Sequence, residues 1–352
     1  MTENLAVQLS DVVLHAPNVH TGGGVALLNA VLAAWPGRRP LRAFLDIRAK
    51  KQLILPASAE ITWVAPSVVD RLRAEVLAGR AADRVGATLL CFHGLPPLVS
   101  IRGKVVIFMQ NRLLLEKSSL AEYPGRVRLR IRIERLWCRI LQGRCTRYVV
   151  QTPSMATLLR RWLDQDTHVS VIPFSSIPSL ESMKSPVAPA KKFDFVYVAS
   201  GEAHKNHRIL LDAWRILADE GLTPSLALTV NAAVHPALSD EINRHANDGG
   251  VNISNLGHVS PAEITQLYTC STALIFPSRL ESLGLPLIEA NLLGLPILAS
   301  ELDYVRDVVD PVETFDPTSP LSIARAVRRF LKAPKPIVKL RTAEEFLLEA
   351  LK

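Results

Sequence analysis

One short segment, residues 272–300, constrains the fold of this chain more than any other. It begins with an apolar run at 272–276 and ends with a second apolar run at 296–300. The helical stretch between them is apolar on almost every side, so we expect that helix to be buried. Gly294 stops the helix just before the second run. The segment therefore predicts a strand, a buried helix and a second buried strand in succession.

Short apolar runs alternate with longer helical patterns elsewhere too, which is typical of βαβ units with parallel strands. The length of 352 residues suggests two domains. We expect one domain at 1–174, a linker rich in Ser and Pro at 175–191, and a second domain at 192–352. Strands are predicted at 11–15, 41–46, 60–65, 87–92, 104–110, 147–151 and 168–173, and then at 193–199, 225–229, 251–256, 272–276, 296–299 and 313–315. Helices at 321–331 and 342–351 end the chain, and the last could pack back on the first domain.

Composition is that of a globular protein, with 48% hydrophobic and 21% charged residues. The first residues lack a basic region and an apolar core, so we expect no signal peptide. The longest apolar tract, 282–299, contains Glu289, Asn291 and two prolines, which argues against a membrane span. The four cysteines form no CxxC pair, which favours reduced thiols and a cytoplasmic location.

Positive charge is concentrated at residues 126–147, where eight arginines accompany a single acid, Glu134. No motif of RNA- or DNA-binding proteins accompanies this segment, so we expect no nucleic-acid partner. Contact with an anionic membrane, at the inner face of the cytoplasmic membrane, is the better functional interpretation. An ordinary helix with a solvated basic face is the alternative.

Two glutamates within residues 272–300 point to a ligand. Glu289 lies in the apolar helix, where an unpaired carboxylate is costly; a ribose hydroxyl pair or a buried Arg could satisfy it. Glu281 stands on the loop before the helix, beside the amides of Ser282, Leu283, Gly284 and Leu285, and free amides at a helix N-terminus suit a phosphate. Two carboxylates around an anion-binding turn describe a sugar-nucleotide site. The alternative is a capping Glu281 and an ion-paired Glu289.

The same segment resembles a known family. Glu281 and Glu289 have seven residues between them, and the flanking glycines and prolines match as well, in FPSRLESLGLPLIEANLLGLP. This is similar to the Glu-x7-Glu motif of retaining glycosyltransferases of family 4. The resemblance implies a GT-B fold, in which two Rossmann-like domains with parallel sheets face each other across a cleft. It covers most of the chain and is strongest from residue 193 to 310.

Three further segments match that family's donor site. Gly22, Gly23 and Gly24 stand between a strand and a helix, where a backbone without side chains can approach a phosphate. The resemblance places Lys205 on the donor diphosphate and the His258–Val259 turn at the nucleotide base. Ser200 stands where relatives commonly carry an Arg, which leaves the diphosphate with one cation fewer.

Strand ends of the first domain supply the candidate acceptor side, because ligands of open parallel sheets gather beyond the carboxyl ends of the strands. His93 follows one such strand, and the resemblance places a His here close to the transferred sugar; a structural His is the alternative. Gln110 and Asn111 follow the next strand and are expected to face the acceptor. The motif-like Asp164-Gln165-Asp166 is interpreted as a helix-ending turn, so no metal ligand is expected.

The resemblance implies a hexosyltransferase that retains anomeric configuration and binds no metal or cofactor. Its donor is a nucleoside-diphosphate sugar, and its acceptor a saccharide or lipid-linked saccharide, as in bacterial surface-polysaccharide assembly. Glu281, His93 and Lys205 are the expected catalytic residues, with Glu289 on the ribose. A sugar-nucleotide 2-epimerase and a non-catalytic nucleotide-sugar-binding subunit of the same fold are the alternatives, the latter favoured by Ser200.

Overall fold

The structure, a computed structural model, describes residues 12–35, 40–116, 119–163, 167–175, 190–247, 250–333 and 342. The predicted linker falls mostly outside these residues, and so do the turn 164–166 and the predicted helix 342–351. The boundary between the two domains stays a prediction.

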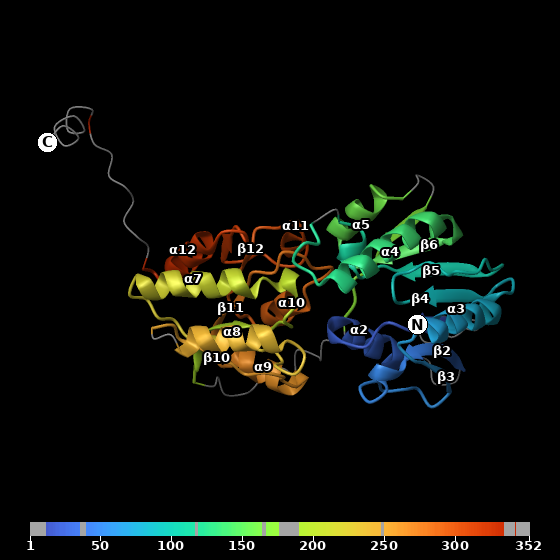
Figure 1. The fold of residues 1–352 in the computed structure, drawn as a ribbon, viewed down its shortest axis with the longest axis horizontal. Coiled ribbons are helices and arrows are strands. Elements are labelled where there is room, and N and C mark those ends of the chain that lie inside the picture. Colours follow the sequence, from blue (N-terminus) through green and yellow to red (C-terminus); the bar gives the residue numbers. More distant parts are fainter. Residues whose placement is uncertain are drawn as a thin grey trace.

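Two parallel sheets organise the described residues (Figure 1). The first has seven strands in the order β3-β2-β1-β4-β5-β6-β7, and the second has six in the order β10-β9-β8-β11-β12-β13. In the first sheet the strands are β1 (Val12–Ala16), β2 (Leu41–Asp46), β3 (Ala59–Val64), β4 (Thr88–Cys91), β5 (Lys104–Phe108), β6 (Arg147–Val150) and β7 (His168–Val171). In the second they are β8 (Phe193–Tyr197), β9 (Leu226–Leu228), β10 (Ile253–Asn255), β11 (Ser271–Phe276), β12 (Ile297–Ser300) and β13 (Glu313–Phe315).

Every predicted strand is present, with ends that differ by a few residues at most. All pairings are parallel, as short strands joined by helices require. The fold prediction of two parallel-sheet α/β domains is therefore confirmed.

Helices connect the strands and cover the sheets. In the N-terminal half they are α2 (Gly22–Ala33), α3 (Val68–Ala82), α4 (Gly125–Leu141) and α5 (Pro153–Arg160), with short 3-10 turns η1 (Ile47–Ala49), η2 (Arg112–Leu114) and η3 (Gln142–Arg144). In the C-terminal half they are η4 (Ala203–Lys205), α7 (His207–Asp219), α8 (Pro236–Asn247), α9 (Pro261–Thr269), α10 (Leu285–Leu292), α11 (Asp303–Arg306) and α12 (Pro320–Phe330). The basic segment 126–147 is thus α-helical from its start to Leu141, and Arg147 at its end begins β6.

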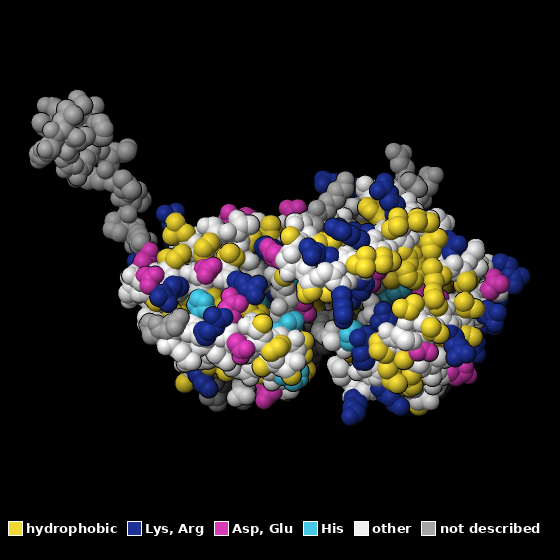
Figure 2. All heavy atoms as spheres, viewed as in Figure 1, with side chains coloured by type: hydrophobic (Ala, Val, Ile, Leu, Met, Phe, Trp, Pro, Cys, Tyr) yellow, Lys and Arg dark blue, Asp and Glu magenta, His cyan; other side chains and the backbone are white. Residues whose placement is uncertain are grey.

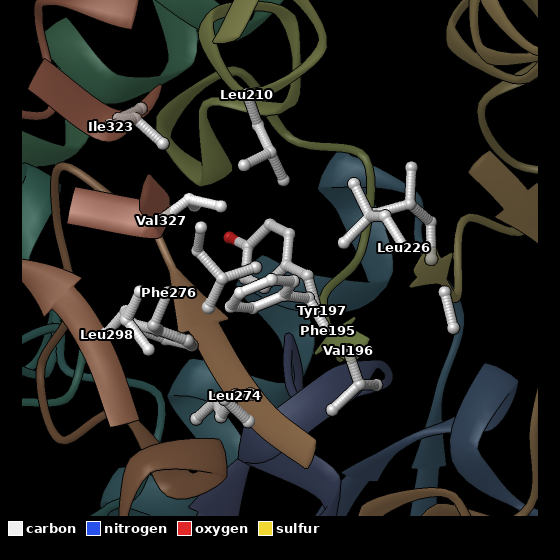
Figure 3. Close-up of a cluster of buried hydrophobic side chains, with 14 of the residues drawn as sticks. Phe195, Val196, Tyr197, Leu210, Leu226, Leu274, Phe276, Leu298, Ile323 and Val327 are labelled. Atoms are coloured by element: carbon white, nitrogen blue, oxygen red, sulfur yellow. The ribbon is translucent and has the colours of Figure 1, made fainter. Parts of the chain in front are cut away.

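The C-terminal sheet has one continuous apolar core (Figure 3). Phe195 and Tyr197 project from β8, and Leu210 of α7 and Val327 of α12 close over them. All four side chains are buried, because β8 lies in the middle of the sheet with helices on its face. This rigid centre positions the loops that follow β8 and β11.

Helix α10 departs from the expected burial. Leu287 and Ala290 are buried, but Leu285 and Ile288 keep partial exposure and Asn291 is exposed. Its apolar outer face turns toward the N-terminal half, close to α2 (Figure 1). The helix is apolar on most sides because it borders the N-terminal half as well as its own core. Among the described residues, no helix combines the length and the apolar character needed to cross a bilayer.

Candidate functional site

Lys205 and Glu281 come together at the carboxyl ends of β8 and β11, although they are 76 residues apart in sequence. The Nζ of Lys205 donates to the Oε1 of Glu281 at 2.6 Å, and the two side chains are 18% and 12% exposed. The backbone carbonyl of Lys205 accepts from the Tyr197 hydroxyl at 2.8 Å. These contacts hold a cation and a carboxylate at the edge of the sheet where ligands of this architecture gather.

The turn that carries Lys205 is fixed by its neighbour. Asn206 has a left-handed backbone, with φ at 65°, and ends η4. Its buried side-chain amide donates to the carbonyls of Pro277 and Pro317 at 3.1 and 2.7 Å. Asn is among the residues that tolerate this conformation, so the local sequence fits the turn. The sequence interpretation had not singled out Asn206.

The N-terminus of α10 lies beside this pair. Gly284 precedes the helix with φ at 73°, and a Cβ there would lie 3.0 Å from Leu287. Within the described part of the chain, the amides of Ser282, Leu283, Gly284 and Leu285 donate to no other group. Free amides at a helix N-terminus attract anions, so this turn and Lys205 together suit a phosphate or diphosphate.

Glu289 finds its hydrogen-bond donor within the chain. The Tyr268 hydroxyl donates to its Oε2 at 2.9 Å. The sequence had suggested a buried Arg or a ribose as the partner of this carboxylate, and neither is required. Burial raises the pKa of the Glu289 carboxyl, and the hydrogen bond from Tyr268 opposes that shift. The second carboxylate oxygen accepts no hydrogen bond from the described residues, which leaves it available to a hydroxyl group.

The glycines at 22–24 form the first turn of α2 itself, where the sequence had suggested a loop before the helix. A Cβ on Gly23 would lie 3.4 Å from the Cδ1 of Leu285, so the N-termini of α2 and α10 face each other across the two halves. Gly22 has φ at 59°, which favours glycine. Both helix starts thus present amides to the same region.

Three of the predicted donor-binding residues form no hydrogen bond with Lys205 or Glu281 in the described structure. Ser200 is exposed, and its hydroxyl donates to the Glu202 carboxylate. His258 is exposed and Val259 half-buried on the turn before α9, whose start is a capping box of Ser260 and Glu263. Their predicted roles stay predictions.

The predicted acceptor residues form hydrogen bonds within the N-terminal half. Gln110 donates its amide to the Phe92 carbonyl at 2.6 Å and lies next to Gly24. Asn111 accepts from the Leu113 amide at 3.1 Å and thereby caps η2. Arg112 follows Asn111, and its guanidinium reaches the Glu281 carbonyl at 3.5 Å from the other half of the molecule.

His93 belongs to a buried cluster with His15 and Glu75. The Oε1 of Glu75 lies 3.7 Å from a ring nitrogen of each histidine, and His93 Nδ1 contacts the His15 carbonyl at 3.1 Å. Burial raises the pKa of Glu75 to about 7 and lowers that of His93 to about 4, while the pKa of His15 is also lowered. Both imidazoles are therefore neutral at neutral pH, and the catalytic role of His93 stays a prediction.

The same three residues are the group within the described ranges that could hold a metal ion. Each offers one ligand atom, and those atoms lie within 4.8 Å of one another. Two imidazoles and a carboxylate are a ligand set that zinc accepts. The expectation of a metal-independent protein is untested, and the predicted turn at 164–166 lies outside the described residues.

Direct contacts join the two halves around the site. Arg279 forms an ion pair with Glu122, and the Tyr123 hydroxyl lies 3.1 Å from His204 Nδ1. Two further hydrogen bonds join Thr152 Oγ1 to the Ser282 carbonyl at 3.2 Å and the Ser154 amide to Asp307 at 2.8 Å. The loop that carries the Glu281 turn is thus held from both halves.

Comparison with known proteins agrees with this geometry. Residues 179–345 match the model of the family described as "Glycosyl transferases group 1". This match lies in the C-terminal half and covers a little less than half of the chain. The match includes both sides of the Lys205–Glu281 pair and all of α10.

Curated relatives match over part of the chain. The serotype-specific mannosyltransferase WbdA of Escherichia coli is 25% identical over 217 residues, which cover 56% of this chain and 26% of that protein. The O-antigen chain mannosyltransferase B of Escherichia coli is 28% identical over 116 residues, 32% of this chain and 30% of that protein. The chain thus spans about a quarter of the length of the first of these relatives. These comparisons favour neither the epimerase nor the non-catalytic alternative.

Solved structures match over nearly the whole chain. HepE of Anabaena, in complex with UDP and glucose, superimposes with a TM-score of 0.65 at 15% identity, covering 92% of this chain and 90% of that one. WaaG, a glycosyltransferase involved in lipopolysaccharide biosynthesis, gives a TM-score of 0.64 at 17% identity, covering 91% and 90%. At these identities the likeness concerns the fold, and it confirms the GT-B arrangement.

Proposed function

We propose that this protein is a retaining glycosyltransferase of family 4 that moves a hexosyl group from a nucleoside-diphosphate sugar to a saccharide or lipid-linked saccharide. The observation that carries the proposal is the Lys205–Glu281 pair beside the free amides of the α10 N-terminus, opposite the glycine turn of α2. Because the curated relatives are named mannosyltransferases, mannose is the first sugar to test.

The diphosphate of the donor would replace Glu281 as the partner of Lys205. Its oxygens would also accept from the amides of Ser282–Leu285 and from the start of α2, two helix N-termini that favour negative charge. Leaving-group charge develops on that diphosphate during transfer, so fixed donors around it stabilise the transition state. Glu281, released from Lys205, would then face the sugar and its developing positive charge.

Glu289 would bind the ribose through its free carboxylate oxygen while Tyr268 holds the other one. Retention of configuration would follow from attack on the face that the diphosphate leaves, with a phosphate oxygen taking the acceptor proton. This step requires no enzyme nucleophile and no metal ion. Contacts between the two halves of the molecule would exclude water and so limit donor hydrolysis.

The experiment that tests this proposal is a thermal-shift panel of GDP, UDP, ADP, CMP and their sugars, repeated on Glu289→Ala. A ligand at 100 times its dissociation constant adds about 2.7 kcal/mol of stability, which is readily visible as a raised midpoint. We expect one nucleoside diphosphate and its sugar to shift the wild type and to lose that shift in the variant. No shift from any nucleotide would contradict the proposal.

We also propose peripheral contact with an anionic membrane through the basic face of α4, at the inner face of the cytoplasmic membrane. Arg128, Arg132 and Arg139 are exposed on this helix. Arg135 instead donates to the carbonyls of Leu113 and Glu116, so it is left unchanged in the test. Changing the three exposed arginines to Glu should abolish sedimentation with anionic vesicles, and unchanged sedimentation would reject this contact.

A further inference from the structure

A groove opens on the N-terminal half between α3 and α4, away from the Lys205–Glu281 pair. Its volume is about 380 Å³, within the range of roughly 300–1,000 Å³ that is usual for small-molecule sites. Val68 and Leu72 of α3 form one wall, and Leu129 and Ile133 of α4 form the other. The lining is completed by Pro17, Asn18, Arg71, Glu75, His93, Leu95, Arg126, Arg130, Glu134 and Trp137.

The two walls expose large apolar side chains, a type of residue that is usually buried in a folded protein. Val68 is 75% exposed, Leu129 59% and Ile133 55%. Figure 2 shows hydrophobic side chains gathered over this face of the N-terminal half. Contiguous apolar surface of this kind marks a binding site more often than isolated exposed residues do.

The loop at residues 92–103 is fixed to α4 and to the turn that follows it by hydrogen bonds. Trp137 donates its indole N–H to the Pro96 carbonyl at 2.9 Å, and Arg144 donates to the Pro97 carbonyl at 3.1 Å. Both acceptors belong to the loop from β4 to β5, which contains no helix. The apolar walls therefore face each other across a fixed loop instead of packing together.

Positive charge surrounds the apolar walls. Arg71, Arg126 and Arg130 line the groove, and the buried Nε of Arg71 has no hydrogen-bond partner. Of the two acids, Glu134 lies 3.7 Å from Arg130, and burial raises the pKa of both Glu134 and Glu75. The groove thus combines an apolar trough with three arginines against two acids, which suits an anionic amphiphile.

The inner end of the groove reaches the edge where chemistry is expected. Asn18 follows β1 and His93 follows β4, and the carboxyl ends of these parallel neighbours meet at one edge of the sheet. Arg71 donates to the side-chain oxygen of Asn18 at 3.0 Å. Four residues beyond Asn18 begins the glycine turn that faces α10.

We propose that this groove binds the lipid portion of the acceptor, with an apolar chain between α3 and α4 and its phosphate or diphosphate on Arg71, Arg126 and Arg130. The proposal rests on the proposed function and names the acceptor as an anionic lipid-linked saccharide. The saccharide end then lies beside Asn18 and His93, toward the glycine turn. A concave trough that leads to this edge fits a single lipid chain better than a flat bilayer surface.

The test is calorimetric titration with dodecyl phosphate below its micelle concentration, with inorganic phosphate and an uncharged dodecyl detergent as comparison ligands. Two groove variants are Leu129→Ser/Ile133→Ser and Arg71→Gln. The matched control is Leu136→Ser/Ile140→Ser, a Leu and an Ile on the same helix that are 59% and 67% exposed and do not line the groove. Donor binding is measured in parallel as the thermal shift from the nucleotide.

We expect saturable binding of dodecyl phosphate, weakened about 10-fold or more in both groove variants and unchanged in the control pair. The donor shift should be the same in all of these proteins. No binding to the wild type, or an equal loss in groove and control pairs, would overturn the groove as an acceptor site while leaving the donor site intact. Absence of the donor shift in the wild type would instead overturn the proposed function.

Discussion

The two halves of the candidate site are built in different ways. In the C-terminal half, the groups that would meet the donor are single side chains and free amides from two neighbouring turns, those after β8 and β11. In the N-terminal half, Gln110 donates to the Phe92 carbonyl, Asn111 caps its own turn, and His93 belongs to a buried cluster. The part of the N-terminal half that remains open is a groove assembled from two helices far apart in sequence.

This difference between the halves indicates which of them determines specificity for the acceptor. A donor diphosphate presents the same charge whatever sugar it carries, so a short cation-and-amide turn is sufficient to hold it. An acceptor differs in shape and in apolar content, so its site requires a surface. We therefore expect donor-half changes to affect the rate of transfer, and acceptor-half changes to affect which molecule is glycosylated.

The largest expected effect follows from Lys205→Ala. Lys205 is the cation paired with Glu281, and its removal leaves the donor diphosphate with the helix amides alone. Loss of one preorganised stabilising group lowers kcat by about 10²–10³-fold. The measurement is release of nucleoside diphosphate in the presence of acceptor, with Lys51→Ala as an exposed-lysine control. A decrease of less than about 10-fold, in a folded variant, would contradict the placement of the diphosphate here.

Glu75→Gln tests the buried cluster of the N-terminal half. The folded-state pKa of Glu75 is about 7 against an ordinary 4.5, so its contribution to stability is complete below pH 4.5 and is lost as the pH rises to 7. The folded-state pKa of His93 is about 4 against 6.5, so its contribution is present above pH 6.5 and is lost as the pH falls to 4. In the wild type these two trends oppose each other.

Glu75→Gln removes the pH dependence that comes from Glu75 and leaves the one that comes from His93. The free energy of unfolding of Glu75→Gln, relative to the wild type, should therefore rise by about 3 kcal/mol between pH 4.5 and 7. Denaturant unfolding at several pH values measures it, and Glu60→Gln, an exposed carboxylate, serves as control. A difference that stays constant with pH would show that Glu75 titrates normally.

The same contrast explains what the sequence could predict. Strands were located because the hydrophobic period and the breaking residues are local signals, as for β8 and β11. Glu281, Glu289 and the α10 turn lie within nine residues, so their neighbourhood could be inferred from spacing alone. Tyr268 was not anticipated as the partner of Glu289, because it comes from a different helix, 21 residues earlier.

The acceptor half shows where such inference ends. The cluster of His15, Glu75 and His93 joins residues up to 78 positions apart, and no spacing rule connects them. In the sequence, Glu75 is one polar position of an ordinary helix. It is buried only because of tertiary packing. Partners brought together by packing alone are predictable only when the topology and the register of the sheet are known.

Tyr268→Phe tests whether the hydrogen bond from Tyr268 supports nucleotide binding by Glu289. The change removes the hydrogen-bond donor that Glu289 has among the described residues, at a position where burial already raises the pKa of that carboxyl. We expect the affinity for the nucleotide to fall about 5-fold, since a net hydrogen bond is worth about 1 kcal/mol. In a Glu289→Ala background the same change should have no further effect on affinity. Additive losses would show that Tyr268 acts independently of Glu289.

The smallest expected effect concerns the contact between the two halves. Arg279 and Glu122 form an ion pair across them, but the side chains are 32% and 53% exposed, so water screens their attraction. A double-mutant cycle with Arg279→Ala and Glu122→Ala should give a coupling of about 0.5 kcal/mol in the free energy of unfolding, smaller still at high salt. Nucleotide affinity should not change. A coupling above about 2 kcal/mol, insensitive to salt, would mean that this pair locks the halves together, and the donor and acceptor sides could then no longer be treated as separable.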